Sequence, residues 1–150
     1  MDQRHLDDQL LFRRDSCSAL LITCSDFRFK SAERAFADGL LPDDYDLIAR
    51  PGAIRSLVAP RTPAARDTLD AEIALLWSVH AFTRVLMVQH VSCRAYDDLT
   101  TEQNEVAVHT AHLTKAKAII ESRFHGVRAE PYLVQMVHGE LVTLPVGTDS

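Results

Sequence analysis

The stretch ALLITCSDFR, residues 19–28, decides how the sequence is interpreted: it is an apolar run that ends abruptly at Cys24. A second stretch, VLMVQHVSC at residues 85–93, is built in the same way and ends in His90 and Cys93. Short continuous apolar runs are typical of strands buried on both faces of a parallel sheet. Each stretch therefore predicts a buried strand that delivers side chains able to bind a metal at its carboxyl end.

Strand-like and helix-like segments alternate along the rest of the chain. Strands are expected at residues 18–23, 46–49, 84–89, 132–137 and 141–144, and helices at residues 32–38, 67–82 and from 100 or 101 to about 124. His138 and Gly139 join the last two strands as a hairpin. The alternation predicts an α/β fold: an open, mainly parallel sheet of four to five strands, with helices on both faces and the last strand antiparallel.

Composition narrows the class of protein. The length of 150 residues suits one domain, residues 1–150, with residues 1–17 as an N-terminal helical segment. A net charge of −5 argues against a nucleic-acid partner. No apolar run approaches the roughly 18 residues that cross a bilayer, so no membrane partner is expected. The charged N-terminus lacks the apolar core of a signal peptide, and we expect a cytoplasmic location.

The three cysteines do not form an obvious disulfide framework, because their number is odd and no secretion signal is present. Cys17 begins the first strand, and we interpret it as a small buried hydrophobe. Cys24, His90 and Cys93 instead follow strands. Ligands of open parallel sheets bind beyond the carboxyl ends of the strands, where the strand order reverses. If the first and third strands are neighbours, about 4.8 Å apart, one metal ion can bridge their ends.

Three such ligands are the number that a catalytic zinc site uses while it leaves a fourth position open. At these residues the sequence resembles the β-class carbonic anhydrases, as a divergent and short member. Residues 24–28 resemble the family's C-x-D-x-R motif, residues 90–93 its H-x-x-C motif and residues 50–53 its arginine- and glycine-containing loop. The resemblance implies one Zn²⁺ per chain, bound by Cys24, His90 and Cys93. It also implies reversible hydration of carbon dioxide to bicarbonate by a zinc-bound hydroxide, and a homodimer or higher homo-oligomer.

Asp26 and Arg28 are the expected catalytic residues, and no cofactor other than zinc is expected. Asp26 could accept a hydrogen bond that orients the attacking oxygen, or it could bind the zinc ion itself. Arg28 could hold Asp26 away from the metal through a bidentate pair. The alternative interpretation is an ordinary surface pair of opposite charges.

The sequence departs from the family pattern around the expected pocket. Gln89 and Arg94 stand where the family usually has glycine, Phe27 stands where a small residue is common, and Gly52 lies in the loop under the site. These four residues are the possible pocket residues. They leave two alternatives open: a related hydrolase of carbonyl sulfide or carbon disulfide, and a non-catalytic zinc-binding or regulatory homologue.

Two histidines on the long helix, His109 and His112, lie about one turn apart. Imidazole titrates near neutral pH, so they could carry protons to and from a site. A solvated helix face is the interpretation that we favour for them.

Overall fold

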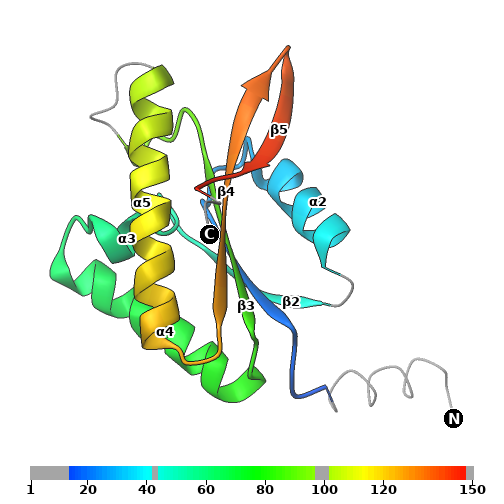
Figure 1. Ribbon diagram of the computed structural model, residues 1–150, viewed down its shortest axis with the longest axis vertical. Helices are drawn as coiled ribbons and strands as arrows, with labels where there is room; N and C mark the ends of the chain where they lie inside the picture. The colour runs from blue at the N-terminus through cyan, green and yellow to red at the C-terminus, as the bar shows by residue number, and fades with distance from the viewer. Residues whose placement is uncertain (1–13, 42–43, 97–101, 148–150) are drawn as a thin grey trace, which may run out of the picture.

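The computed structural model describes residues 14–41, 44–96 and 102–147 (Figure 1). Five strands of this part of the chain form one sheet in the order β2-β1-β3-β4-β5. Pairing is parallel from β2 through β4, and β5 is antiparallel to β4. The strands are β1 Ala19–Thr23, β2 Tyr45–Ala49, β3 Arg84–His90, β4 Arg128–Val137 and β5 Glu140–Pro145. The predicted mainly parallel sheet with an antiparallel last strand is confirmed.

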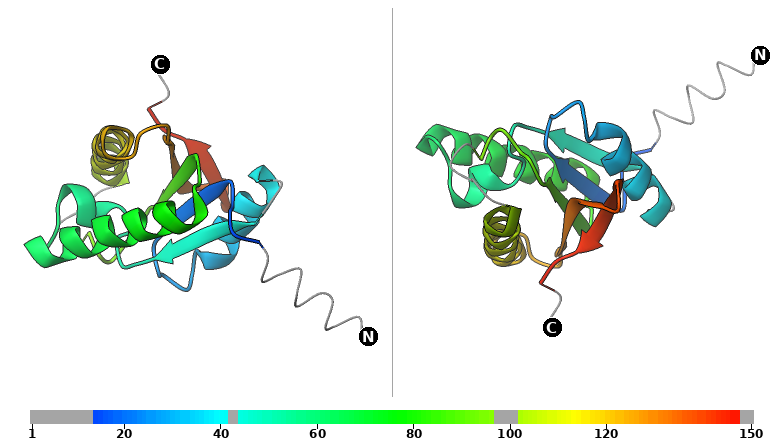
Figure 2. Two further views of the ribbon diagram at one scale, coloured as in Figure 1. Left: turned by 90° about the horizontal axis from the view of Figure 1, so that it is seen from below. Right: turned by 90° about the horizontal axis from the view of Figure 1, so that it is seen from above.

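Helices cover both faces of the sheet, as the alternation predicts (Figure 2). They are α2 Lys30–Leu40, α3 Arg55–Val58, α4 Pro63–His80 and α5 Glu102–Arg123. Within β1, Leu20 and Ile22 belong to the cluster of buried residues under α3, α4 and α5, whereas Ala19 and Leu21 pack toward α2. Because successive strand residues point to opposite faces, β1 contributes to both cores and is buried along its whole length.

The helix boundaries differ from the sequence-based ranges where capping was misjudged. Helix α4 begins at Pro63 because the Thr62 side chain accepts a hydrogen bond from the Ala65 amide at 3.2 Å. Proline suits the first turn, where no amide donor is needed. The expected start at residue 67 was therefore wrong, and the short helix α3 was not predicted. Helix α2 continues past the expected end at residue 38, through Gly39 to Leu40.

The position of β1 between β2 and β3 places the reversal of strand order between β1 and β3. Thr23 is in register with Ala49 on one side and with Val88 on the other, so these carboxyl ends lie together. The segments that follow β1 and β3 therefore start from neighbouring points. This is the arrangement that the sequence predicted for residues 24 and 90.

Most of the expected N-terminal helical segment, residues 1–13, lies outside the described residues, and residues 14–17 are not helical. That residues 1–150 form a single domain stays a prediction. None of the helices described between residues 14 and 147 has the length and apolar character needed to cross a bilayer.

Candidate metal centre

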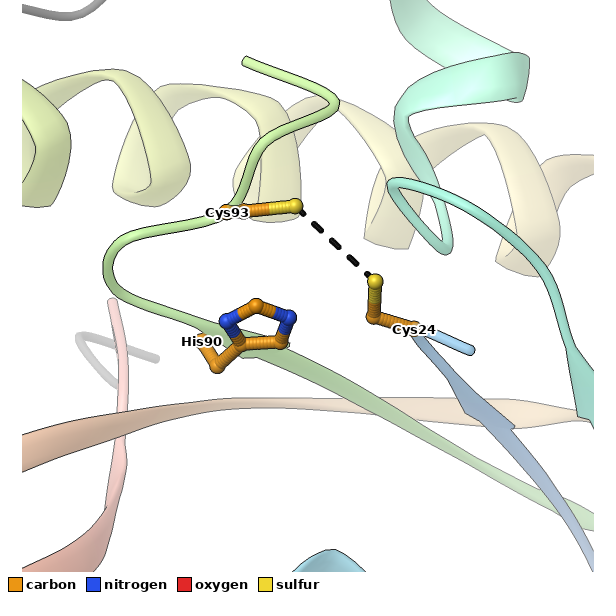
Figure 3. Close-up of side chains that lie close together, drawn as sticks. All are labelled: Cys24, His90 and Cys93. Atoms are coloured by element: carbon orange, nitrogen blue, oxygen red, sulfur yellow. Dashed lines mark hydrogen bonds between the residues drawn. The ribbon is translucent and has the colours of Figure 1, made fainter. Parts of the chain in front are cut away.

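Cys24, His90 and Cys93 come together at the carboxyl ends of β1 and β3. Cys24 follows β1 directly, and His90 is the last residue of β3. Ser92 takes a left-handed backbone conformation, with φ of 58°, and the chain turns back so that Cys93 faces Cys24. The two Sγ atoms are 3.9 Å apart (Figure 3). One ligand atom from each of the three residues lies within 4.8 Å of the other two, and all three residues are buried.

This arrangement fits a tetrahedral zinc ion. Two zinc–sulfur bonds of about 2.3 Å at a tetrahedral angle place the sulfurs about 3.8 Å apart. The Nδ1 atom of His90 lies 2.8 Å from the Val91 carbonyl, which accepts its proton and leaves Nε2 as the ligand nitrogen. That Nε2 atom is buried and has no hydrogen-bond partner among the described residues. A buried nitrogen without a partner is rare unless an ion or a water molecule binds there.

The orientation of the imidazole is set by its neighbours. The ring of Phe29 stacks on it, with a centroid separation of 4.0 Å and an angle of 14° between the planes. Burial opposes the charged form of His90, but the nearby Cys24 sulfur and the hydrogen bond to the Val91 carbonyl together outweigh burial and raise the pKa of His90. Zinc binds the neutral imidazole, so protonation of His90 would compete with metal binding.

The two thiols do not lose their protons equally. The hydrogen bond with Cys93 lowers the pKa of Cys24, because a neighbouring thiol stabilises the thiolate. The same hydrogen bond raises the pKa of Cys93, since a second thiolate would face the first. A divalent cation between the sulfurs removes this conflict, because it supplies the positive charge that two thiolates need.

Asp26 and Arg28 form a bidentate pair at the rim of this cluster. Arg28 donates from Nε to both carboxylate oxygens at 3.1 Å and from Nη2 to Oδ2 at 2.6 Å. Arg28 Nη2 also donates to the Ser92 carbonyl at 2.9 Å, which ties the pair to the turn before Cys93. This pairing lowers the pKa of Asp26 to about 2, so the carboxylate is ionised at neutral pH.

The Asp26 carboxylate also faces His90, with 3.9 Å between Oδ2 and Nε2. Within the described residues, the group of mutually close ligand atoms contains the two cysteines and His90 but not Asp26. Arg28 thus holds the carboxylate beside the cluster rather than in it.

An open cleft of about 520 Å³ leads to the cysteines, and residues 24–28, Pro51 and residues 93–95 line it. Two of the four possible pocket residues, Phe27 and Arg94, are part of this lining. The Phe27 side chain is 78% exposed. Gly52 and Gln89 are not among the lining residues; Gln89 is only 2% exposed and lies behind the site.

Gln89 and Gly52 instead support the loop at residues 50–53. Gln89 Nε2 donates to the Gly52 carbonyl and to the Tyr96 hydroxyl, each at 3.0 Å. Gly52 has a φ of 77°, and a Cβ atom added there would lie 3.1 Å from the Cβ atom of Ala95. The loop before α3 therefore packs closely against the segment that carries Cys93. On its other side, the Arg50 side chain pairs with Glu72 of α4.

Two buried titratable residues near the site were not recognised from the sequence. Glu33 is fully buried on α2, and its carboxylate has no hydrogen-bond partner in the described part of the chain. Burial raises the pKa of Glu33 to about 8. Its spacing with Phe29 and Ala37, four residues to either side, placed it on the buried face of the helix and was the signal that was missed.

His109 is the second such residue, and its expected position on a solvated helix face was wrong. It is fully buried, its ring lies 4.4 Å from that of Tyr96, and burial lowers its pKa to about 4. Its spacing from Leu113 and Ala116 continues the apolar stripe of α5. His112 lies partly buried one turn away, with Nδ1 3.1 Å from the Tyr96 hydroxyl.

Comparison with known proteins gives different results at the level of sequence and of structure. No protein-family model matches the chain. An uncharacterized protein of Rickettsia bellii is 29% identical over 127 residues, which cover 80% of this chain and 77% of that protein. An uncharacterized protein of Rickettsia conorii is 28% identical over 127 residues, covering 80% and 68% of the two chains.

Solved structures similar to this one include β-carbonic anhydrases. A carbonic anhydrase from Streptococcus mutans superposes with a TM-score of 0.56 at 11% identity, covering 98% of this chain and 99% of that chain. A tetrameric β-carbonic anhydrase from Sordaria macrospora gives a TM-score of 0.53 at 12% identity, covering 95% and 89%. The β-carbonic anhydrase CafA of Aspergillus fumigatus gives 0.53 at 15% identity, covering 95% and 82%. At these identities the likeness concerns the fold alone: this chain has the β-carbonic anhydrase fold.

Proposed function

We propose that this protein is a zinc-dependent carbonic anhydrase that catalyses the reversible hydration of carbon dioxide to bicarbonate. The observation that carries the proposal is the buried group of Cys24, His90 and Cys93, whose sulfurs are 3.9 Å apart, with an ionised carboxylate fixed at its rim. A purely structural zinc site closes with four protein ligands. Here the described residues bring together three ligands, and an open cleft reaches the two cysteines among them, as access of a substrate to a catalytic site requires.

Cys24, His90 and Cys93 would hold the zinc ion. When bound, zinc supplies a Lewis acid that makes water a nucleophile near neutral pH. Asp26 is the residue placed to handle the proton of the attacking water, because its carboxylate is ionised and lies 3.9 Å from His90 Nε2. Accepting a hydrogen bond at a carboxylate oxygen orients the oxygen lone pair toward carbon dioxide.

Arg28 acts as a positioning residue for Asp26. Its guanidinium donates to both carboxylate oxygens and holds Asp26 beside the group of Cys24, His90 and Cys93. Arg28 and Arg94 also place positive charge on the cleft lining, where the bicarbonate anion is formed and leaves.

Metal analysis combined with a stopped-flow assay of carbon dioxide hydration tests the proposal. The unsubstituted chain should contain zinc and hydrate carbon dioxide, and Cys24→Ser should lose both properties together. A chain that binds zinc through these residues but does not hydrate carbon dioxide would overturn the proposal. That result would favour the non-catalytic zinc-binding or regulatory homologue.

A second candidate function is hydrolysis of carbonyl sulfide or carbon disulfide with the same metal site. The observation that favours it is Phe27, a large and exposed side chain at the cleft where the family resemblance leads one to expect a small residue. Measuring the turnover of carbon dioxide and of carbonyl sulfide by the same zinc-loaded sample distinguishes the two candidate functions. If Phe27 selects the larger, more polarisable substrate, Phe27→Ser should shift the ratio toward carbon dioxide.

We further propose that the chain assembles as a homodimer or higher homo-oligomer, in keeping with the similar enzyme from Sordaria macrospora that is described as tetrameric. Light scattering on the purified chain measures its mass. The cytoplasmic location stays a prediction, which cell fractionation tests.

A further inference from the structure

A second group of metal-binding side chains lies at the opposite edge of the sheet. Cys17 precedes β1, Asp46 is the second residue of β2, and His80 is the last residue of α4. One ligand atom of each lies within 4.8 Å of the other two. Cys17 is seven residues before Cys24, and at about 3.3 Å per residue a strand of that length spans roughly 20 Å. The two groups therefore cannot share one ion.

The three side chains are held together by contacts between their own segments. His80 Nδ1 lies 2.6 Å from Asp46 Oδ2. The backbone amide of Cys17 donates to the His80 carbonyl at 3.2 Å, which fixes the start of β1 to the end of α4. The Cys17 side chain packs at the margin of the core under α4, and its thiol donates to the Ala19 carbonyl at 3.4 Å. Three separate segments thus present sulfur, nitrogen and oxygen to the same point.

We propose that Cys17, Asp46 and His80 form a second binding site for a divalent metal ion, with zinc as the ion that best suits a thiolate, an imidazole and a carboxylate together. Zinc accepts all three donor types, with bonds of about 2.0 to 2.3 Å. The site also lies at the carboxyl end of an 18-residue helix, where the helix dipole favours a positive charge.

Metal binding at this site requires only small movements of the side chains and the loss of the Cys17 thiol proton. A nitrogen and an oxygen bound to one tetrahedral zinc ion lie about 3.3 Å apart, so the His80 and Asp46 side chains would separate by less than about 1 Å. Both side chains have room to do so, since they are 35% and 20% exposed. Burial and the nearby Asp46 carboxylate raise the pKa of Cys17, so its thiol keeps its proton until a metal competes for the sulfur.

The expected consequence is a metal-dependent gain in stability. An ion bound only by the folded chain stabilises it by mass action. Because the ligands come from the start of β1, from the edge strand β2 and from the end of α4, the ion would add a further link between three segments that already contact one another through strand pairing and hydrogen bonds. This inference does not rest on the proposed carbonic anhydrase activity, since it uses none of the residues of the first site.

Zinc stoichiometry by equilibrium dialysis tests the proposal on the full chain. The unsubstituted chain should bind two equivalents at micromolar free zinc, and Cys17→Ser should bind one. Asp46→Asn should weaken the second equivalent by about tenfold or more, which is the scale seen when groups around a metal are removed. Equal stoichiometry in the unsubstituted chain and in Cys17→Ser would overturn the proposal.

Cobalt substitution identifies which sulfur is involved. Cobalt bound to Cys17 should give a thiolate-to-cobalt absorption band in a Cys24→Ser, Cys93→Ser chain, in which Cys17 is the remaining cysteine. If that chain does not fold, the difference spectrum between the unsubstituted chain and Cys17→Ser carries the same information. If no absorption band depends on Cys17, the second site is contradicted, and the proposal for the first site is unaffected. If only the first site fails to bind metal, the Cys17-dependent band should still be present.

Discussion

The amino ends and the carboxyl ends of the parallel strands form two opposite edges of the sheet, called here the amino edge and the carboxyl edge. Both edges carry the same kinds of polar side chain, but they differ in whether those side chains have hydrogen-bond partners. At the amino edge, His80 pairs with Asp46 at 2.6 Å, and Arg84 pairs with Glu130 at 2.7 Å. At the carboxyl edge, His90 Nε2 is buried and has no partner among the described residues. An unpartnered buried polar atom costs roughly 1 to 3 kcal/mol of folding free energy. The carboxyl edge is therefore the less stable edge of the pair.

Other unfavourable features collect at the same edge. The fully buried side chains of Glu33 and His109 lack hydrogen-bond partners within the described ranges. Ala53 and Ser92, close to the cysteines and His90, have φ of 47° and 58°. The amino edge has fewer such features: Ala81 has φ of 53°, and the buried Ser18 Oγ has no partner among the described residues. Such strain persists where the surrounding structure holds it, and it gathers at functional sites. The comparison shows that unpartnered polar atoms and strained backbone are more numerous at the carboxyl edge, which agrees with the functional site proposed there, whereas most charged groups at the amino edge are paired.

The largest expected effect comes from removing the unpartnered imidazole. His90→Ala should lose zinc from the first site and lower carbon dioxide hydration by about a thousandfold or more, since the metal is essential to the reaction. The exposed His125, beside β4 at the amino edge, offers a matched control. His125→Ala should leave zinc content and turnover unchanged in a stopped-flow assay. Equal losses of zinc and of turnover in both variants would contradict the difference between the two edges.

A smaller effect is expected from the carboxylate at the rim. Asp26→Asn should keep the bound zinc and lower turnover about a hundredfold. The neutral amide is a weaker hydrogen-bond acceptor for the attacking water than the carboxylate, and it cannot take up a proton. Asp70, which pairs with Arg123 on the exposed surface at 3.4 Å, is the matched Asp–Arg control. Asp70→Asn should leave turnover within twofold. Unchanged turnover in Asp26→Asn would remove Asp26 from the mechanism.

Next in size is the effect of acid on the buried histidine of α5. The pKa of His109 is lowered to about 4 in the folded chain, against about 6.5 when unfolded, so the unfolded chain binds more protons between these values. This contribution to stability is complete above pH 6.5 and is lost as the pH falls toward 4. It amounts to about 2 kcal/mol between pH 7 and pH 5.

Urea denaturation at both pH values measures this loss. His109→Leu should remove about 2 kcal/mol of the pH dependence of the free energy of unfolding. His125→Leu, at an exposed position, should keep it. If the free energy of unfolding depends on pH in the same way in His109→Leu and in the unsubstituted chain, the pKa of His109 does not differ between the folded and unfolded states.

The smallest expected effect concerns the backbone of the loop under the site. Gly52→Ala should lower the free energy of unfolding by about 1 to 2 kcal/mol, because φ of 77° strains an alanine and its Cβ atom would meet Ala95 at 3.1 Å. Gly39→Ala, inside α2 with no atom near the added Cβ, should instead raise it by up to about 1 kcal/mol. Thermal unfolding of the two variants gives the comparison, and destabilisation by both would contradict it.

Much of the fold could be predicted because the buried strands of a parallel sheet are continuous apolar runs. The runs that end at Thr23 and at His90 were recognised in this way, and their order along the chain implied the reversal between β1 and β3. Element ends were harder to predict, since they depend on single capping contacts. The start of α4 depends on one hydrogen bond from the Ala65 amide to Thr62, and α3 is a single turn without a periodic pattern.

The candidate site divides in the same manner. Its donor types and their spacing were visible in C-x-D-x-R and H-x-x-C, because short motifs keep the residues on one strand end or one turn. The burial of Glu33 and the hydrogen bonds of Gln89 to the loop at residues 50–53 and to Tyr96 were not visible, because they depend on which helix or loop covers these residues. The group at Cys17, Asp46 and His80 is of this second kind, since nothing along the chain connects positions 17, 46 and 80.

By itself, the sequence determined the α/β class, the parallel core strands and the cysteine and histidine residues that follow them, since these properties depend on local hydrophobic pattern and motif spacing. Tertiary structure alone decided the 3.9 Å approach of the two sulfurs, the unpartnered nitrogen of His90 and the meeting of three segments at the opposite edge. The physical reason is that distances between segments are set by how β1, β3 and α4 pack, which no single segment specifies.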